Sequence, residues 1–386
     1  MTWGPTDRRT RLLGFGLGTL FGAYFALYAI TILGRRETYR FPDFFALWAD
    51  GRLLASHPAA DLYNPEILPA WQMALGMPEP GNTPFPYPPI FMPVVRLLGL
   101  PPYNVGYAVF MAVTLGLYLV ALATPRPRAP LLLMAFVAPT TIITLVAGQT
   151  GFLAGGLMLG GLRLARARPL VGGVLLGLLA FKPQFGLLVP FALAAASAWR
   201  CIAAAVATVL LLALATSAGF GWHIWADWVA YMPNFSARFD RESDQLLYLM
   251  PTLTGSLRAF GLSPAATRLP QLGLAMLSAV WVWRACREGL GPRALLVLAT
   301  ATFLATPYAF VYDLPLLTGA ALLFARERLD ARRGLSTGEV AVLTLALVFP
   351  AVLVHAGAAL PIGVACLLLL AAVLIADPPT KDAARP

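Results

Sequence analysis

Apolar runs dominate the chain and exclude most of the folds that a polypeptide of this length could adopt. Hydrophobic residues make up 59% of its 386 residues and charged residues only 12%, and the mean hydropathy is +0.73. Many runs approach the roughly 20 residues that cross about 30 Å of hydrocarbon as a helix. The sequence therefore predicts an all-α, polytopic membrane protein, with a single integral membrane domain over residues 1–386.

The basic residues fall in short clusters between these runs, which is a topology signal. Placing the first cluster in the cytoplasm puts 18 of the 28 Lys and Arg residues, and both termini, on that side. We therefore expect about twelve membrane crossings. The predicted crossings are residues 12–33, 103–123, 131–147, 151–165, 169–181, 184–198, 201–218, 270–286, 293–305, 308–325, 338–355 and 359–376.

Two polar regions are predicted to face outward. The first, residues 35–102, begins with a segment rich in proline and aromatic residues, from Arg35 to Pro89. That segment cannot lie in lipid, because each unpaired polar group there would cost several kcal/mol. The second covers residues 219–270 and includes an apolar stretch expected to lie on or dip into the membrane. Neither region alternates like a strand, so we expect short helices and proline-stiffened loops.

Several runs between residues 131 and 199 are shorter than a full crossing. They are joined by Gly, Gln, Lys and Pro residues. Broken backbone is tolerated at membrane depth only where it lines a cavity or is buried in protein. The pattern therefore predicts helices that stop part-way and line a water-filled cavity open to the outer side.

Asp43 is a candidate catalytic residue, because it lies just outside the first helix next to Pro42 and two phenylalanines. Aromatic neighbours desolvate a carboxylate and make it a better base. The alternative is that Asp43 is the N-cap of an amphipathic helix. Seven residues on, Asp50 is expected to pair with Arg52 or with solvent, and Asp61 fits a turn.

Lys182 is one of only two lysines in the chain and lies between two apolar runs. A lysine at that depth is costly unless it snorkels to the interface or meets an anion. Gln149 lies at the neighbouring outer turn, so the two side chains could converge on one phosphate. Snorkelling of Lys182 is the alternative.

Asp313 lies beside Tyr308 and Tyr312, near the outer start of a late crossing. Ionisable groups inside a membrane are rare and are usually paired or functional. Asp313 is therefore expected either to complete the polar site or to form an ion pair with an arginine.

The sequence FPYPP at residues 85–89 places rigid prolines around an aromatic pair. Proline fixes its own backbone and restricts the residue before it, so the segment is expected to pin an extended chain as it returns to the membrane. A role for these rings, Tyr87 among them, along the substrate path is the second interpretation.

The remaining signals argue against cofactors and nucleic acid. Neither the three histidines nor the three cysteines have metal-ligand spacing, and the chain has no dinucleotide fingerprint or P-loop. No cofactor is implied; a divalent ion stays open as an alternative, although no motif indicates one. The net charge of +10 is spread over the topology clusters, so we expect no nucleic-acid partner.

Taken in order, these motifs resemble glycosyltransferase family 87, over roughly residues 12–325. That family groups polyprenol-phosphate-mannose-dependent mannosyltransferases with many bacterial proteins once described only as a domain of unknown function. The motifs that carry the resemblance are Asp43-Phe44 after the first helix, Leu62-Tyr63, the FPYPP segment from Phe85, Gly148-Gln149 and Lys182-Pro183-Gln184.

The resemblance implies a GT-C architecture, with about 12 transmembrane helices and a large first extracytoplasmic loop containing short helices. It also implies that Asp43 is the general base of an inverting hexosyltransferase in the bacterial cytoplasmic membrane. The chain departs from better-known members, which carry a histidine in the late motif. The substrate-binding residues expected with Asp43 are Lys182, Gln149, Gln184, Tyr308, Asp313, Tyr87 and Tyr63.

The implied reaction moves a sugar, with mannose favoured, from a polyprenyl-phosphate donor to a lipid-linked or envelope acceptor at the outer face of the membrane. A glycolipid or glycan is the expected acceptor, and membrane lipid surrounds the site. Two alternatives stay open at this point. The chain could be a transporter or flippase of lipid-linked saccharides, which also needs broken helices, or a non-catalytic subunit of an envelope-assembly complex.

Overall fold

Every element of regular structure in the described residues is a helix, as the apolar runs predict. The computed structural model describes residues 8–34, 42–77, 84–124, 127–242, 244–330, 335–356 and 363–376. The α-helices are α1 (Arg8–Gly34), α2 (Pro42–Ser56), α3 (Ile67–Ala74), α4 (Met92–Leu98), α5 (Tyr103–Ala123), α6 (Ala129–Val137), α7 (Pro139–Ala147), α8 (Gly151–Leu164), α9 (Pro169–Leu178), α10 (Pro183–Gly186), α11 (Val189–Ala195), α12 (Trp199–Phe220), α13 (Ile224–Glu242), α14 (Leu253–Ala259), α15 (Pro264–Cys286), α16 (Pro292–Ala305), α17 (Pro315–Asp330), α18 (Thr337–Ala356) and α19 (Gly363–Ala376). The 3₁₀ helices are η1 (Ala59–Tyr63), η2 (Pro89–Phe91), η3 (Leu179–Phe181), η4 (Asp244–Leu249) and η5 (Val311–Asp313).

Three helices of the described residues are long and apolar enough to cross a membrane: α5, α12 and the Thr337–His355 part of α18. The pair α6 and α7 counts as a fourth if its 49° bend belongs to one broken span. The shorter apolar stretches have 10–17 residues, among them Gly14–Ile30 within α1, so twelve crossings stay a prediction. Together these helices fit a multi-pass membrane protein.

Large apolar side chains cover the outer faces of the long helices. A water-soluble monomer rarely exposes continuous apolar surface of this kind, whereas a lipid-facing helix requires it. The exposed residues are Val105, Val109, Val113 and Val120 on α5, Val206, Leu210, Leu211 and Leu214 on α12, and Leu269, Leu272, Met276, Leu277 and Val280 on α15.

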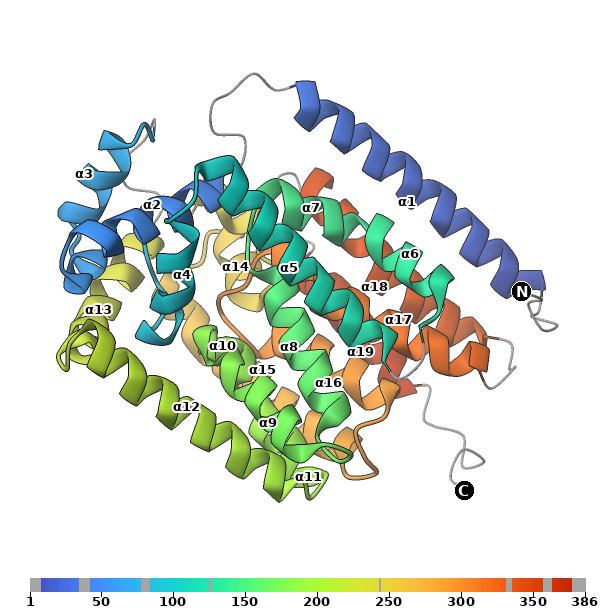
Figure 1. Cartoon of the computed structure of the whole chain (residues 1–386). Helices are drawn as coiled ribbons and strands as arrows, with labels where there is room; N and C mark the ends of the chain where they lie inside the picture. The colour runs from blue at the N-terminus through green and yellow to red at the C-terminus, as the bar shows by residue number, and fades with distance from the viewer. Residues whose placement is uncertain are drawn as a thin grey trace.

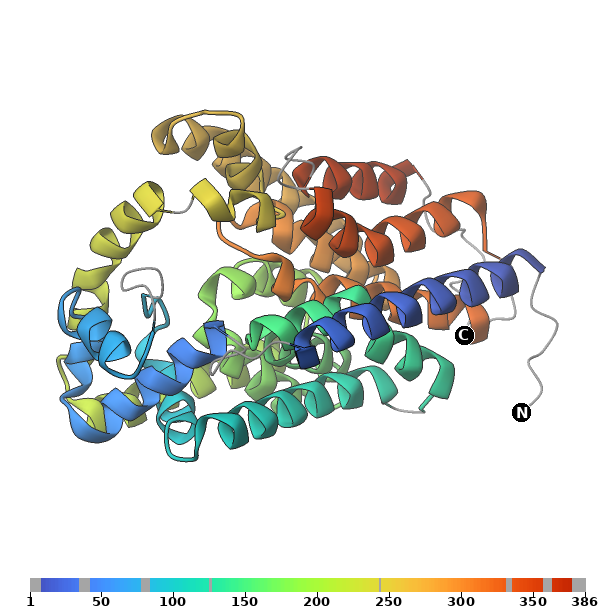
Figure 2. The ribbon, with the colours of Figure 1, turned by 90° about the horizontal axis from the view of Figure 1, so that it is seen from above.

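Four helices, α2, α3, α4 and α13, gather at one end of the molecule, and α1 begins at the opposite end (Figure 1, Figure 2). We call this group, with η1 and η2, the lobe. It contains the described part of the first predicted outward region, of which residues 35–41 and 78–83 lie outside the described residues. The second region differs from the expected short helices, because α13 is a 19-residue helix that packs against η1 and η2.

Three of the predicted cytoplasmic basic clusters meet at the far end of the bundle. Arg163 and Arg326 donate hydrogen bonds to carbonyl oxygens in the last turn of α5 and just beyond it. Arg128 forms an ion pair with Asp330 at the end of α17. Basic side chains are favourable there, because the last carbonyl groups of a helix have no partner within the helix.

The backbone of α2 touches α4 directly at a pair of glycines. A Cβ atom added to Gly51 would lie 2.1 Å from the carbonyl oxygen of Val95, and one added to Gly99 would lie 2.3 Å from the carbonyl carbon of Gly51. Small residues let two helices approach this closely. The contact fixes where α2 lies, and with it every side chain that α2 directs inward.

We expect Gly51→Ala to destabilise the protein by about 1–3 kcal/mol, because the added methyl group would have to displace backbone atoms of α4. Gly116→Ala is the matched control, since nothing lies within 4 Å of a Cβ atom added there in α5. The measurement is the thermal unfolding midpoint of the purified protein. Equal midpoints for the two variants would contradict the close contact.

Candidate active site

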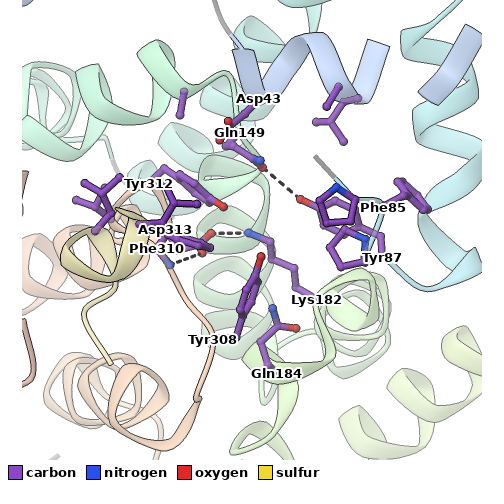
Figure 3. A pocket seen from close by; sticks show the side chains of 18 of the residues that line it. Asp43, Phe85, Tyr87, Gln149, Lys182, Gln184, Tyr308, Phe310, Tyr312 and Asp313 are labelled. Atoms are coloured by element: carbon purple, nitrogen blue, oxygen red, sulfur yellow. Dashed lines mark hydrogen bonds and ion pairs between the residues drawn. The ribbon is translucent and has the colours of Figure 1, made fainter. Parts of the chain in front are cut away.

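A cavity of about 570 Å³ lies where the lobe meets the bundle (Figure 3). Its lining combines residues of α2 and α13 with residues of α1, α7 and α18, and of the segments that precede α8, α11 and α17. Tyr63 does not line the cavity. The other seven predicted site residues all do: Asp43, Tyr87, Gln149, Lys182, Gln184, Tyr308 and Asp313.

Two breaks in the helices bring Gln149 and Lys182 to the cavity wall. Gly148 ends α7 in the left-handed conformation (φ 69°, ψ 33°), which glycine adopts without strain, so Gln149 lies between α7 and α8. Lys182 precedes Pro183 and has φ −123° and ψ 76°, outside the helical region that a following proline disfavours. The predicted broken helices therefore border the cavity at both places.

Lys182 forms a buried ion pair with Asp313. Lys182 Nζ lies 2.5 Å from Asp313 Oδ1, and the two residues are only 5% and 2% exposed. Asp313 Oδ2 accepts a hydrogen bond from the backbone N–H of Phe310 at 3.2 Å. Removing either partner would leave one buried charge uncompensated, so each holds the other in place.

This ion pair distinguishes between the alternatives that the sequence left open for Lys182 and for Asp313. Lys182 does not snorkel to the interface, because its ammonium group is buried and meets a carboxylate. The expectation that Asp313 pairs with an arginine is wrong, since its partner is a lysine 131 residues away in the chain. That partner could not be read from residues near Asp313.

The turn that carries Asp313 is held by three neighbouring helices. Thr144 Oγ1 donates a hydrogen bond to the carbonyl oxygen of Tyr312 at 3.0 Å, and Tyr118 Oη donates to that of Pro315 at 2.9 Å. A Cβ atom added to Gly151 would lie 1.8 Å from the carbonyl oxygen of Tyr312, so α8 begins directly against the turn. Tyr308, at the start of the same segment, also faces the cavity.

Asp43 is half-buried in the first turn of α2 and faces Gln149 across the cavity wall (Figure 3). It follows Pro42, which begins the helix, so Asp43 is not the N-cap. Burial raises the pKa of its carboxyl group from 3.8 to about 6, while a hydrogen bond from Gln149 and the charge of Lys182 oppose part of the rise. A carboxylate with this pKa is ionised at neutral pH and is a stronger base than an exposed one.

Gln149 connects Asp43 to the aromatic wall. Its Oε1 accepts hydrogen bonds from Tyr87 Oη and from the backbone N–H of Thr150, both at 3.2 Å. An amide oxygen that accepts twice leaves the amide N–H groups to donate. Gln149 therefore presents donors toward Asp43, which agrees with its effect on that pKa.

The FPYPP segment forms part of the cavity wall through Phe85, Pro86 and Tyr87. Tyr63 Oη donates a hydrogen bond to the carbonyl oxygen of Tyr87 at 2.9 Å, and Trp228 Nε1 donates to that of Pro86 at 3.3 Å. The chain is thus pinned, as expected, and its rings still face the cavity. Tyr63 therefore stabilises this part of the wall through its hydrogen bond to Tyr87, although Tyr63 itself does not line the cavity.

Sequence reasoning misjudged Asp50, which lines the same cavity and is only 2% exposed. It accepts a hydrogen bond from Gln72 Nε2 at 2.9 Å, while the guanidinium group of Arg52 lies over the ring of Trp48. Burial raises the pKa of the Asp50 carboxyl group to about 8, and the bond from Gln72 opposes the rise. The sequence signal that could have identified Asp50 as a cavity residue is its seven-residue spacing from Asp43, because that spacing places both residues on one face of a helix.

The rest of the cavity wall is apolar. It is formed where α1, α7, η4 and α18 meet. Both α7 and η4 contact α18, and α7 also contacts α1. Tyr28 of α1 and His355 of α18 share a hydrogen bond of 3.3 Å beside this wall. The apolar residues are Ile143, Val146, Ala147, Leu246, Leu249, Val311 and Val354.

Within the described residues, no group of three or more His, Cys, Asp or Glu side chains is arranged to hold a metal ion. The acidic and basic residues of the described cavity lining are Asp43, Asp50, Lys182 and Asp313. The arrangement can accept a proton at Asp43 and can offer hydrogen-bond donors from Lys182 and Gln149 to an anion.

One comparison with known proteins gives a match. The family model described as glycosyltransferase family 87 matches residues 85–307, which is more than half of the chain. The match begins at the FPYPP segment and includes Gln149 and Lys182, whereas Asp43 and Asp313 lie outside it. No curated protein and no solved structure matches the chain significantly.

We expect Lys182→Met to destabilise the protein by about 3 kcal/mol or more, because Asp313 would keep a buried charge without its partner. Combining Lys182→Met with Asp313→Asn should recover most of the lost stability. Thermal unfolding of the wild type, both single variants and the double variant measures the coupling. Additive effects of the two substitutions would show that the ion pair is not coupled.

Proposed function

Because the chain belongs to glycosyltransferase family 87, we propose that it is an inverting enzyme that uses a polyprenyl-phosphate sugar as donor, with mannose as the favoured sugar. The acceptor is a lipid-linked or envelope glycan, and transfer takes place at the outer face of the bacterial cytoplasmic membrane. The observation that carries this proposal is the shared cavity. A carboxylate of raised pKa and a buried lysine line it together with apolar side chains of α7, η4 and α18.

Asp43 is the general base in this mechanism. It takes the proton of an acceptor hydroxyl group, whose oxygen then forms a bond to the anomeric carbon of the donor sugar. The bond between that carbon and the phosphate oxygen breaks, and its electron pair leaves with the polyprenyl phosphate. Attack from the face opposite the leaving group inverts the configuration. A pKa of about 6 keeps Asp43 ionised at neutral pH and ready to accept this proton.

Lys182, Gln149 and Tyr308 stabilise the negative charge that grows on the leaving phosphate. An ammonium group carries three N–H donors, and the ion pair with Asp313 uses one of them. Asp313 keeps Lys182 in place and offsets its charge. Preorganised donors of this kind act where charge develops in the transition state. Gln184, which lines the same side of the cavity, is the next polar group beside them.

The apolar wall supports a lipid donor. A polyprenyl chain needs an apolar surface, and α7, η4 and α18 supply apolar side chains in the same cavity as the polar groups. A nucleotide-sugar donor would instead call for groups that hold a ribose and a diphosphate.

The lobe faces outward in this proposal, and the end with the arginine clusters faces the cytoplasm. Arg128, Arg163 and Arg326 share that end, as the positive-inside rule requires. Donor head group and acceptor then meet at the outer surface, where the lobe covers the cavity.

We expect Asp43→Asn to lower the rate of sugar transfer by roughly 10²- to 10⁴-fold, the usual contribution of a general base. The assay uses the reconstituted protein with polyprenyl-phosphate mannose and candidate glycolipid acceptors. In the wild type, kcat/KM should fall as the pH drops below about 6, because protonated Asp43 cannot take a proton. Asp61→Asn is the control, since Asp61 does not line the cavity; near-wild-type transfer by Asp43→Asn would reject Asp43 as the base.

The orientation is tested by labelling single cysteines in a background without Cys201, Cys286 and Cys366. Ser56→Cys, at the exposed end of α2, should react with an impermeant reagent in intact cells. Ala167→Cys, exposed between α8 and α9, should react only after the membrane is permeabilised. The reverse pattern would place the cavity on the cytoplasmic side.

A further inference from the structure

Asp50 is the second carboxyl group that α2 contributes to the cavity, and the proposed mechanism does not use it. It lies seven residues after Asp43 on α2, which is nearly two helical turns, or about 10 Å along the axis. The two residues therefore share one face of the helix and line one cavity. From its first to its last residue, α2 runs toward the end of the molecule where α3 and α13 lie (Figure 1).

Holding α3 against α2 does not require Asp50. Trp71 Nε1 already donates a hydrogen bond to the carbonyl oxygen of Ala49 at 2.9 Å, and this bond joins the same two helices one residue away. A buried carboxyl group is costly, so its position in a cavity wall favours a role in binding. Gln72 does not line the cavity, and it fixes the Asp50 carboxyl group by donating a hydrogen bond to Oδ1.

The chemistry of Asp50 fits a neutral, hydroxyl-bearing ligand. Its raised pKa keeps the carboxyl group protonated at neutral pH. Since Oδ1 accepts from Gln72, Oδ2 carries the proton and can both donate and accept a hydrogen bond. On α13, Tyr231 interacts electrostatically with both Asp50 and Arg238, and neither Tyr231 nor Arg238 is among the described residues of the cavity lining.

The lobe end of the cavity has the composition of a small carbohydrate site. Phe85 and Trp228 supply aromatic surface to the same lining as Asp50, and Pro84 and Met232 add apolar surface to it. Ligand sites commonly combine such surface with a few placed polar groups. In the described lining the cation is Lys182, which lies at the other end and is paired with Asp313.

We propose that Asp50, held by Gln72, forms the acceptor subsite and binds an uncharged, hydroxyl-rich ring. The inference rests on the proposed function, because the donor phosphate occupies the Lys182 end and Asp43 marks the point of transfer. It goes beyond that function by giving the acceptor class: a neutral sugar or polyol head group, without a phosphate on the ring that is recognised.

The test is direct binding of octyl mannoside and of octanol, which share a chain and differ in the sugar. The full-length protein is held in lipid nanodiscs, so that no sugar detergent competes, and Kd is measured by calorimetry. Wild type should prefer octyl mannoside. Asp50→Leu should raise its Kd for octyl mannoside by roughly five- to tenfold, the effect of losing one or two neutral hydrogen bonds, and leave octanol unchanged.

Asp50→Asn should keep the affinity within about twofold, because an amide can accept from Gln72 and still donate. Asp61→Leu removes an acidic residue of the lobe outside the cavity lining and controls for general effects, and unfolding midpoints confirm that each variant is folded. An unchanged Kd in folded Asp50→Leu would overturn the subsite. Equal binding of mannoside and octanol by the wild type would also overturn it.

The binding measurement does not depend on catalysis. A wild-type protein that binds the mannoside through Asp50 but transfers no sugar would reject the proposed function and keep the subsite. In a transferring enzyme, Asp50→Leu should raise the KM for the acceptor by the same factor and leave the donor KM unchanged. A purely structural role would instead lower the amount of active protein and leave both constants as they were.

Discussion

A buried ion pair between Lys182 and Asp313 is the interaction on which the site depends. It joins two interruptions of the helical bundle that are 131 residues apart in the chain. Each charge would be strongly unfavourable in this setting without the other. The break at Lys182 and the turn before α17 must therefore stay together, and that turn is also fixed against α7 and α8. Gln149, at the junction of those two helices, is placed beside the pair as a result.

Local backbone chemistry explains which parts of the site could be predicted from the sequence. A glycine in the left-handed region and a residue before proline interrupt helices wherever they occur, so the breaks at Gly148 and Lys182 were predictable. The candidate base could also be found, because its aromatic neighbours are adjacent in the sequence. The ion-pair partner of Lys182 could not, since the approach of Asp313 depends on the packing of distant helices. Asp50 was misjudged for the same reason: its burial comes from α3.

At the level of the fold, composition predicted an all-helical protein, and the predicted runs correspond to helices of the bundle. The helix α13 was missed, because Pro233 and a charged patch interrupt its apolar pattern. Packing stabilises its helical form: the Tyr231 ring lies against the Tyr63 ring, and Trp228 donates a hydrogen bond to the carbonyl oxygen of Pro86. The lobe helices thus cover the cavity. The long segments between the predicted crossings fold because they pack against one another and against the bundle.

The rigid placement of α2 has a consequence for the product of the reaction. A helix does not stretch, and the contact between Gly51 and Gly99 prevents α2 from sliding along α4. The separation of Asp43 and Asp50 is therefore set by the backbone and does not adapt to the acceptor. If Asp50 holds the ring, only the hydroxyl group that reaches back to Asp43 can be deprotonated. The position of the new glycosidic linkage would then be determined by helix geometry rather than by the intrinsic reactivity of the sugar.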